Sequence, residues 1–198
     1  MFLRELCAFA ISAFITHFEM KIIILDRDGV INQDSDNFIK TVDEFIPLPG
    51  SVEAIAKLKH AGYKVYIATN QSGIYRGFYN EDTLHKMHDK LAKLLNEYDV
   101  KIDGIEYCPH GPDDNCDCRK PKTGMYLTIA KNAGLTDYKN ILVVGDSLRD
   151  LQAAQSINAK PHLVRTGKGE RTIAKGEGLS EIPVYNDLAD FVNQLLNT

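Results

Sequence analysis

The sequence predicts an α/β protein built on a doubly wound, mainly parallel sheet of five or six strands with helices on both faces. Three short apolar runs rich in β-branched residues lie at 22–25, 64–68 and 141–144, and each passes directly into polar residues. Such runs are typical of strands that are buried on both faces. Helical patterns lie between them, and strands that alternate with helices form parallel sheets. With 198 residues, of which 44% are hydrophobic and 25% charged, the chain is long enough to bury such a core.

Two aspartates follow the first apolar run. Asp26 and Asp28 stand one residue apart where the strand ends, and side chains alternate along an extended chain, so both carboxylates project to one side. Gly29 permits the turn that comes next. Ligands bind at the carboxyl ends of strands in open α/β sheets. An Asp-x-Asp pair also occurs in exposed turns, but here it suits a divalent cation and a division between nucleophile and acid–base group.

A loop and a helix separate the first two strands. Residues 33–43 are polar and show no helical or strand period, which fits a solvated loop and equally a flap that contacts a sugar. Ser51 begins a helix with apolar residues at helical spacing, and Gly62 ends it. The next helix is expected to begin after Asn80, a residue type that caps helix starts.

Hydroxyl and amide side chains follow the second predicted strand, at 64–68. They are Thr69, Asn70, Gln71 and Ser72, directly ahead of Gly73. A glycine-containing turn presents free backbone N–H groups, which together with these side chains can hold a phosphoryl oxygen. Residues of these types also cap ordinary loops. Their position one β-α-β unit after Asp26 favours the phosphate interpretation.

Three of the four cysteines cluster after a short strand predicted at 103–107. Cys108, His110, Cys116 and Cys118 follow the pattern C-x-H-x5-C-x-C, whereas Cys7 stands alone. Three thiolates and one imidazole at this spacing predict a zinc site, and four protein ligands leave no open position for catalysis, so the zinc is expected to be structural. Clustered reduced thiols favour the cytoplasm over an oxidising compartment.

The second half of the chain repeats the arrangement of a buried strand that ends in carboxylates. The strand at 141–144 leads through Gly145 to Asp146, with Asp150 four residues further on. Asp150 fits a metal ligand and equally a carboxylate that meets the dipole of the following helix. A helix over 123–133, a strand over 161–164, a glycine-rich basic turn over 165–169 and a last amphipathic helix over 188–196 complete the expected elements. The turn has no role assigned by the sequence.

Together these motifs resemble the haloacid dehalogenase-like phosphatase superfamily. They are Asp-Arg-Asp-Gly at 26–29, Thr-Asn at 69–70, Lys120, and Gly-Asp-x-x-x-Asp at 145–150, in the family's order. The resemblance implies that Asp26 attacks phosphorus to form an aspartyl-phosphate, while Asp28 protonates the leaving group and then activates water. It also implies Mg²⁺ held by Asp26, the backbone carbonyl of Asp28, and Asp146, with the phosphoryl group held by Thr69, Asn70 and Lys120.

The intervals between these motifs are too short for a folded cap domain, so we expect an open site bordered by loops. The zinc loop and the Arg-Lys-Pro at 119–121 are similar to the subgroup that acts on heptose bisphosphates and on histidinol phosphate. The resemblance implies removal of the 7-phosphate of D-glycero-D-manno-heptose 1,7-bisphosphate, in lipopolysaccharide precursor synthesis. Histidinol phosphate is the alternative substrate. A non-catalytic, zinc-stabilised binding module on the same scaffold is the alternative from another functional class.

The expected substrate contacts lie around the rim of this site. They are Arg27, Asp34, Asp36, Asn37, Asn70, Gln71, Ser72, Arg119 and Ser147. Arg119, beside the zinc loop, is the candidate for recognising the remainder of the substrate, and its alternative is an ordinary surface ion pair. Some enzymes of the subgroup carry a lysine in place of Ser147, which leaves that contact open.

Charge and the N-terminal segment limit the expected partners. A formal net charge of −4 provides no broad basic surface, so nucleic acid is not an expected partner. The apolar stretch at 6–18 is too short to cross a bilayer and lacks signal-peptide features, so no membrane partner is expected. We expect residues 1–19 to be an extension, or a short amphipathic helix, ahead of one phosphatase domain over 20–198. The chain is expected to act as a monomer on a small phosphorylated sugar.

Overall fold

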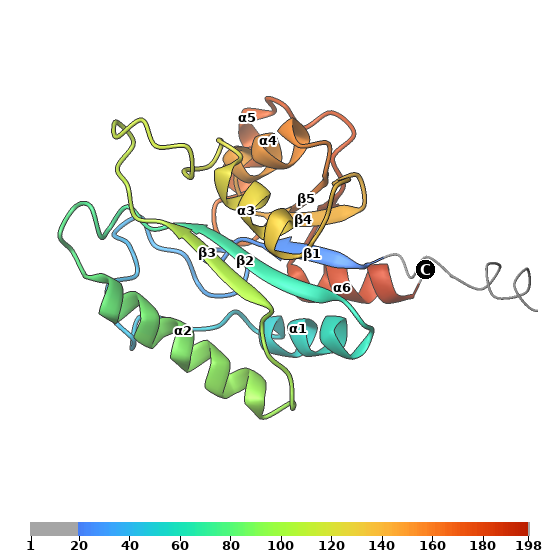
Figure 1. The fold of residues 1–198 in the computed structure, drawn as a ribbon, viewed down its shortest axis with the longest axis horizontal. Coiled ribbons are helices and arrows are strands. Elements are labelled where there is room, and N and C mark those ends of the chain that lie inside the picture. Colours follow the sequence, from blue (N-terminus) through green and yellow to red (C-terminus); the bar gives the residue numbers. More distant parts are fainter. Residues whose placement is uncertain (1–19, 198) are drawn as a thin grey trace, which may run out of the picture.

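Six parallel strands form one sheet within residues 20–197, the part of the chain that the computed structural model describes. Their order is β3-β2-β1-β4-β5-β6 (Figure 1). The strands are β1 (Ile22–Leu25), β2 (Lys64–Asn70), β3 (Gly104–Cys108), β4 (Ile141–Gly145), β5 (Lys160–Val164) and β6 (Val184–Tyr185). All neighbouring pairs among them are parallel. The predicted doubly wound parallel sheet is confirmed. The predicted extension at 1–19 lies outside the described residues.

The chain changes direction across the sheet between β1 and β4. From β1 it proceeds outward through β2 to β3, and it then returns to β4 on the other side of β1. Leu25 pairs with Val144, and the backbone N–H of Asp26 donates to the carbonyl of Val144 at 2.9 Å. Because both strands end at this level, the carboxylates that follow them meet at a topological switch point, where open α/β sheets bind ligands.

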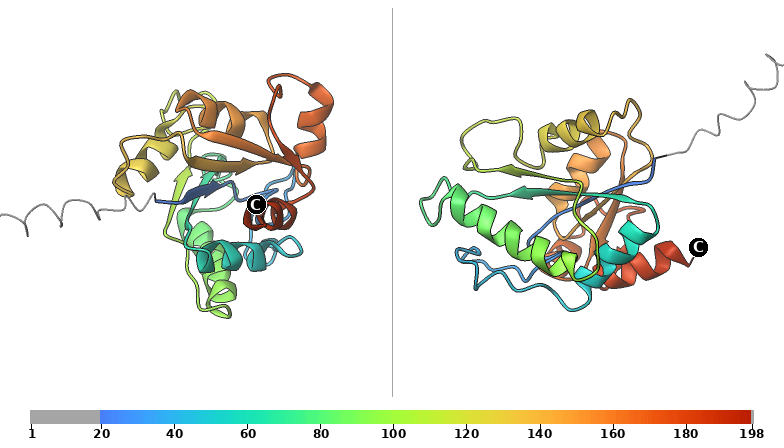
Figure 2. Two further views of the ribbon diagram at one scale, coloured as in Figure 1. Left: turned by 90° about the vertical axis from the view of Figure 1, so that its right-hand side faces the viewer. Right: turned by 60° about the horizontal axis from the view of Figure 1, so that its bottom comes forward.

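Helices cover both faces of the sheet (Figures 1 and 2). One face carries α1 (Ser51–His60), α2 (Glu81–Asn96) and α6 (Leu188–Leu196), whose apolar residues share one core cluster. The other face carries α3 (Gly124–Asn132) and α4 (Leu148–Ser156), which share a second cluster. The short α5 (Gly169–Lys175) precedes β6.

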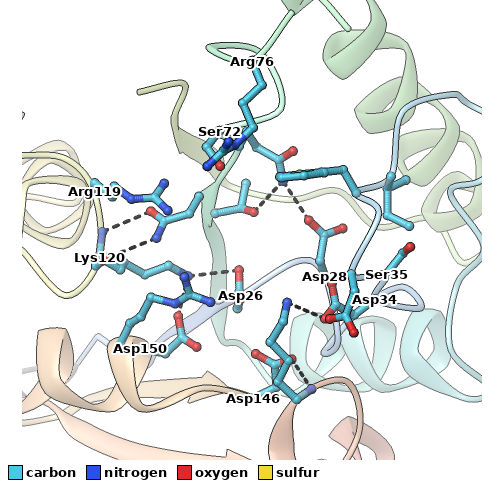
Figure 3. A pocket seen from close by; sticks show the side chains of 18 of the residues that line it. Asp26, Asp28, Asp34, Ser35, Ser72, Arg76, Arg119, Lys120, Asp146 and Asp150 are labelled. Atoms are coloured by element: carbon cyan, nitrogen blue, oxygen red, sulfur yellow. Dashed lines mark hydrogen bonds and ion pairs between the residues drawn. The ribbon is translucent and has the colours of Figure 1, made fainter. Parts of the chain in front are cut away.

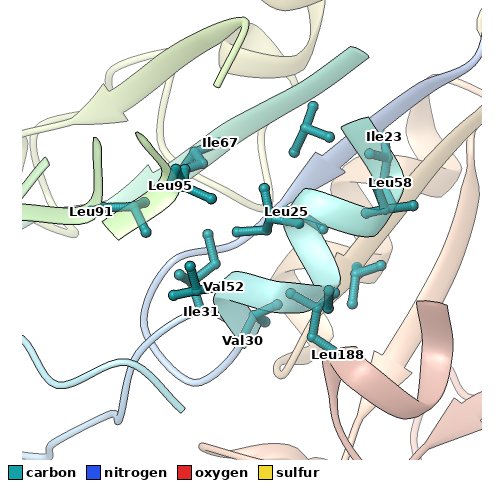
Figure 4. Close-up of a cluster of buried hydrophobic side chains, with 14 of the residues drawn as sticks. Ile23, Leu25, Val30, Ile31, Val52, Leu58, Ile67, Leu91, Leu95 and Leu188 are labelled. Atoms are coloured by element: carbon teal, nitrogen blue, oxygen red, sulfur yellow. The ribbon is translucent and has the colours of Figure 1, made fainter. Parts of the chain in front are cut away.

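The two core clusters follow from alternation along β1. Ile23 and Leu25 point into the first cluster, which Figure 4 shows, whereas Ile22 and Ile24 point into the second. All four are at most 1% exposed. Full burial of an apolar side chain of this size contributes about 1.5–3 kcal/mol, so this strand alone anchors both layers. The carboxylates that follow β1 are thereby attached to a strand that is buried on both faces.

The connections fit the sequence expectations, with two additions. Residues 33–46 lack helix and regular strand, as expected, and an isolated bridge between Asn32 and Pro47 closes their base. Asn80 caps α2 by accepting the backbone N–H of Thr83, which confirms the predicted helix start. The glycine-rich turn at 165–169 leads into α5, a helix that the sequence did not predict, since its seven residues carry few apolar side chains.

No interval between the catalytic motifs holds a folded cap in the described part of the chain. The longest interval without helix or strand after β1 spans residues 26–50, and the loop at 109–123 carries the cysteine cluster. None of the helices within residues 20–197 combines the length and apolar character that crossing a bilayer requires.

Candidate active site

A cavity of about 280 Å³ opens at the carboxyl ends of β1, β2 and β4 (Figure 3). It brings together most of the residues that the sequence singled out. Those that line it are Asp26, Asp28, Asp34, Asp36, Thr69, Asn70, Gln71, Ser72, Arg119, Lys120, Asp146 and Asp150. They come from positions up to 124 residues apart in the chain, so the fold, rather than local sequence, assembles the site.

Three carboxylates lie together on the cavity floor. One oxygen from each of Asp26, Asp146 and Asp150 lies within 4.8 Å of the others. Burial raises the pKa of Asp26 to about 6, with Lys120 opposing and Asp150 and Asp28 adding to the rise. Burial, followed by the nearby charges of Asp26 and Asp150, also raises the pKa of Asp146 well above its usual value. Three buried carboxylates this close together are stable in their ionised form only when positive charge lies next to them.

Lys120 supplies part of that positive charge. Its Nζ lies 3.0 Å from Asp26 Oδ1 and 2.6 Å from Asp150 Oδ1, and it donates to the carbonyl of Ala68 at 2.7 Å. Its side chain is 2% exposed. Burial acts to lower the pKa of this ammonium, but the carboxylates of Asp150 and Asp26 outweigh burial and raise the pKa above its usual value. Lys120 is therefore positively charged throughout the physiological pH range.

Asp150 lies at the start of α4 and close to the other two clustered carboxylates, and its alternative as a metal ligand stays a prediction. Its Oδ2 accepts from the backbone N–H and the hydroxyl of Ser147, at 3.1 and 2.6 Å, which forms a capping box at the start of α4. Its Oδ1 faces Lys120 and lies among the three clustered carboxylates. The hydroxyl of Ser147 is thereby turned toward Asp150, and this residue does not line the cavity. Its predicted contact with substrate stays a prediction.

Asp28 is held apart from the carboxylate cluster by hydrogen-bond donors. Arg27 donates to it through Nε and Nη2 at 2.8–3.0 Å, Asn32 through Nδ2 at 2.8 Å, and Gln71 through Nε2 at 2.9 Å. Burial acts to raise the pKa of Asp28, but the guanidinium of Arg27 and these hydrogen bonds hold it below its usual value. Figure 3 shows Asp28 on the opposite side of Asp26 from Lys120.

Arg27 itself lies beneath the site. Its side chain is fully buried, its Nη1 lies 3.7 Å from the sulfur of Met87, and it sits over the ring of Phe45. It does not line the cavity, so the expectation of a substrate contact is not met. Alternation along the chain is a signal that could have indicated this, because the residue between two site aspartates points to the opposite side. Asn37, also expected to touch substrate, is exposed outside the cavity lining.

The residues at the end of β2 and just after it are coupled to Lys120 and Asp28, which lie on either side of Asp26. Asn70 and Lys120 exchange hydrogen bonds, with the Nδ2 of Asn70 donating to the Lys120 carbonyl and its Oδ1 accepting the Lys120 N–H, both at 3.1 Å. Gln71 Nε2 donates to Thr69 Oγ1 at 2.8 Å as well as to Asp28. The hydroxyl of Tyr79 in turn donates to Gln71 Oε1. The loop after β2 therefore fixes the relative positions of Lys120 and Asp28.

The carboxylate cluster fits a hard divalent cation. Mg²⁺ prefers oxygen ligands and uses few carboxylates. Burial first, and then the neighbouring carboxylates, raises the pKa values of Asp26 and Asp146, and a bound dication would favour their ionised forms. The side chain of Asp28 is turned toward Arg27 and is not part of the cluster. Its predicted participation in metal binding through the backbone carbonyl stays a prediction.

The cysteine loop fits a tetrahedral zinc ion. Cys108 Sγ lies 3.6 Å from both Cys116 Sγ and His110 Nδ1, and His110 Nδ1 lies 3.2 Å from Cys118 Sγ. All four ligand atoms lie within 4.8 Å of one another. Zinc–sulfur bonds of about 2.3 Å place the corners of a tetrahedron roughly 3.7 Å apart, close to these separations. The loop also supports the site, because Arg119 Nη1 donates to the carbonyl of His110 at 3.2 Å.

Several cavity residues had no predicted role. They are Ser35, Phe38, Ile39, Arg76, Tyr79, Arg149 and Lys168. Arg76 lies over the ring of Phe38, with 5.8 Å between its guanidinium carbon and the ring centroid. Arg149 stands within the last motif, one residue before Asp150, which was the one available sequence signal for it. Arg76 and Lys168 lie on loops, where no periodicity indicates the direction of a side chain.

Comparison with known proteins agrees with this geometry. The family of haloacid dehalogenase-like hydrolases matches residues 25–158. The D-glycero-beta-D-manno-heptose-1,7-bisphosphate 7-phosphatase of Bordetella bronchiseptica is 53% identical over 178 residues, which are 89% of this chain and 98% of that protein. The protein of the same name from Pseudomonas putida is 51% identical over 177 residues, covering 89% of this chain and all of the relative.

A solved structure shows the same similarity in three dimensions. D,D-heptose 1,7-bisphosphate phosphatase from B. bronchiseptica, complexed with magnesium and phosphate, aligns with a TM-score of 0.86 at 50% identity. The alignment covers 90% of this chain and 99% of that protein.

Proposed function

This chain belongs to the haloacid dehalogenase-like hydrolase family, and we propose that it removes the 7-phosphate of D-glycero-β-D-manno-heptose 1,7-bisphosphate. It is a phosphomonoester hydrolase. The observation that carries the proposal is the convergence of Asp26, Asp28, Lys120 and Asp146 in one cavity. Relatives about 50% identical over nearly their whole length bear the name of this activity, and their names support the β anomer.

Asp26 is the proposed nucleophile. A carboxylate oxygen of Asp26 forms a bond to phosphorus, and the bond between phosphorus and the C7 oxygen of the sugar breaks, which gives an aspartyl-phosphate. Lys120 lies 3.0 Å from Asp26, so its ammonium offsets the repulsion between the attacking anion and the phosphate. Thr69 and Asn70 are placed to hold phosphoryl oxygens. When bound by Asp26, Asp146 and the Asp28 carbonyl, Mg²⁺ supplies the remaining charge neutralisation.

Asp28 is the proposed acid–base residue. The departing C7 alkoxide requires a proton, and Asp28 supplies it and then accepts a proton from the water that attacks the aspartyl-phosphate. The products are the heptose 1-phosphate, inorganic phosphate and regenerated Asp26. Arg27, Asn32 and Gln71 favour the ionised form of Asp28, whereas the approach of a phosphate dianion raises its pKa. Substrate binding and protonation of Asp28 are therefore coupled.

The basic side chains that line the cavity support a substrate that carries a second phosphate. Of the basic residues that line the cavity, Lys120 and Lys168 pair with carboxylates. Arg76, Arg119 and Arg149 line it without an ion-pair partner among residues 20–197. Guanidinium groups bind phosphate oxygens in pairs, so these arginines suit the 1-phosphate of the sugar. Asp34 and Asp36 are proposed contacts for sugar hydroxyls.

The remaining properties follow from the same proposal. Zn²⁺ is proposed as a structural ion in the loop of Cys108, His110, Cys116 and Cys118, which favours a reducing compartment such as the cytoplasm. Action as a monomer is part of the same proposal. We place the reaction in the synthesis of heptose precursors for the lipopolysaccharide core.

The experiment that tests the proposal is a comparison of kcat/KM on four phosphate esters. They are the β and α anomers of D-glycero-D-manno-heptose 1,7-bisphosphate, histidinol phosphate, and an aryl phosphate as a generic ester. We expect the β bisphosphate to be preferred by at least ~10²-fold over histidinol phosphate, as for a site with dedicated polar contacts. A preference for histidinol phosphate would overturn the substrate assignment. Absence of turnover on all four esters with Mg²⁺ present would instead support a binding module.

A further inference from the structure

The turn at 166–168 packs directly on the catalytic motifs, although the sequence assigned it no role. Thr166 Oγ1 donates to the carbonyl of Gly29 at 2.6 Å, and the backbone N–H of Lys168 donates to Asp146 Oδ2 at 2.7 Å. A Cβ added at Gly167 would lie 2.5 Å from the Cα of Gly29 and would collide with the Asp146 carboxylate. Gly167 has a φ of 58°, a conformation that glycine adopts without strain. The turn is therefore fixed against both aspartate motifs.

The side chain of Lys168 leaves this turn toward the polar loop at 33–38. Its Nζ lies 2.6 Å from Asp34 Oδ2, and the two side chains are 33% and 13% exposed. Both residues line the cavity, and Figure 3 labels Asp34 next to Ser35. Burial acts to lower the pKa of Lys168, but Asp34 raises it above its usual value, so the pair is ionic at neutral pH.

A second ion pair joins the same two segments. Arg171, in α5, donates to both carboxylate oxygens of Asp36 at 2.8 Å. This pair is more exposed than the first, with side chains 66% and 62% exposed, and such pairs contribute little to stability. The backbone N–H groups of Asn37 and Phe38 donate to Ser35, inside the loop itself, and Gln33 at its start donates to the carbonyl of Ile46. The better buried Lys168–Asp34 pair is thus the main charged link between this loop and the rigid part of the site.

We propose that Lys168 is a positioning residue that sets the loop at 33–38 over the cavity by holding Asp34, from a turn whose backbone is fixed on Asp146. The Lys168–Asp34 ion pair has two functions in this proposal. It ties the loop to the turn at 166–168, in addition to the contacts of the Phe38 ring with Phe78 and Arg76. It also neutralises a carboxylate that faces the space of a highly anionic substrate, where an unpaired Asp34 repels phosphate. The effect on substrate rests on the proposed function, whereas the effect on the loop does not.

Steady-state kinetics on the heptose bisphosphate test the substrate effect. Lys168→Met keeps the backbone N–H that Asp146 accepts and removes only the ammonium. We expect KM to rise about tenfold with kcat changed less than about threefold, because positioning of the loop affects binding more than chemistry. Lys168→Arg should restore most of the affinity. Arg165→Gln is the matched control, since Arg165 is exposed and pairs with Glu170 away from the cavity.

A double-mutant cycle with Asp34→Asn separates positioning from direct contact with substrate. If Lys168 acts through Asp34, the KM penalty of Lys168→Met falls from about tenfold to less than about threefold in the Asp34→Asn background. An equal penalty in both backgrounds would show that the ammonium binds substrate itself, which overturns the proposal.

Amide hydrogen exchange tests the link without substrate. Residues 33–38 should exchange about tenfold faster in Lys168→Met than in the parent, while β1 and β4 stay unchanged, since only the loop loses an anchor. Unchanged exchange in the loop would refute the positioning role. If the parent protein fails to hydrolyse the bisphosphate, the proposed function is wrong. The exchange measurement then still tests whether Lys168 positions the loop at 33–38.

Discussion

Lys120 Nζ lies 3.0 Å from Asp26 Oδ1 and 2.6 Å from Asp150 Oδ1, so one buried ammonium neutralises two of the three clustered carboxylates. This arrangement explains how acidic groups with little solvent around them are kept together in the folded state. It also means that catalysis and stability are coupled in this protein, because the residues proposed for phosphoryl transfer form a buried ionic network.

Substitution Asp26→Asn should abolish turnover and leave the fold intact. The amide cannot attack phosphorus, so we expect kcat to fall by at least ~10⁴-fold, as for loss of other catalytic nucleophiles. Because burial raises the pKa of Asp26 to about 6, its charged form is disfavoured in the folded protein, and the neutral isostere should not lower the melting temperature. Kinetics and thermal unfolding on the same sample check both points. Retained activity would end the covalent mechanism.

Substitution Lys120→Met should damage both activity and stability. It leaves the buried Asp150 without its cation, and an unpaired buried charge costs about 3–5 kcal/mol of unfolding free energy. Adding Asp150→Asn should recover part of that loss but none of the activity. Denaturant unfolding and kcat measure the two effects. Lys122→Met is the matched control: this neighbouring lysine is 44% exposed, and a large effect there would contradict the assignment to Lys120.

Substitution Cys116→Ser should remove zinc and weaken turnover. We expect one zinc per chain in the parent and a strongly reduced content in the variant, with the sheet retained because the loop lies outside it. Activity should fall because Arg119 donates to His110 in the same loop and Lys120 follows it directly. Metal analysis, circular dichroism and kinetics provide the readout. Cys7→Ser is the control, and full zinc content in Cys116→Ser would exclude the predicted site.

His162 should contribute a loss of stability as the pH falls below about 6.5, opposite in sign to the contribution of the raised pKa values of Asp26 and Asp146. Burial, followed by Lys160, lowers the pKa of His162 to about 4, and neither ring nitrogen has a hydrogen-bond partner among residues 20–197. Between about pH 6.5 and 4 the unfolded chain binds a proton that the folded one does not, which removes up to about 1.4 kcal/mol of unfolding free energy per pH unit.

The variant His162→Phe tests this assignment. The ring packs 4.8 Å from Phe191 between centroids, so a phenylalanine fits the same apolar surroundings. Its unfolding free energy should depend less steeply on pH over this interval, as measured by denaturant titration. The exposed His60→Gln is the control. An unchanged slope in His162→Phe would show that other groups cause the acid sensitivity.

Deletion of residues 1–19 should leave activity and melting temperature close to those of the full chain. The chain from Met20 onward contains both core clusters and every cavity residue described above. We therefore propose that the phosphatase domain comprises residues 20–198, and expect kcat/KM to change by less than about twofold on truncation. Loss of folding or of turnover would assign a role to the first nineteen residues.

The fold was predictable because each element has a local signal. Ile22 to Leu25 form a short apolar run that only a doubly buried strand accommodates, and β4 repeats this pattern before Asp146. Parallel strands place the residues that follow them at one edge, so the meeting of Asp26 and Asp146 follows from strand order. The cysteine cluster was equally local, since its four ligands lie within eleven residues.

The sequence by itself determined the sheet, the Cys/His cluster and the identity of the acidic residues at the strand ends, since these depend on periodicity and short-range spacing. Only the tertiary structure decided the environment of each group. It buried Arg27 beneath Asp28, used Ser147 to cap α4, and brought Lys168 to Asp34 from 134 positions away in the chain. Loop side chains have no periodicity that fixes their direction, so their contacts and charge states follow from how the loops pack around the completed sheet.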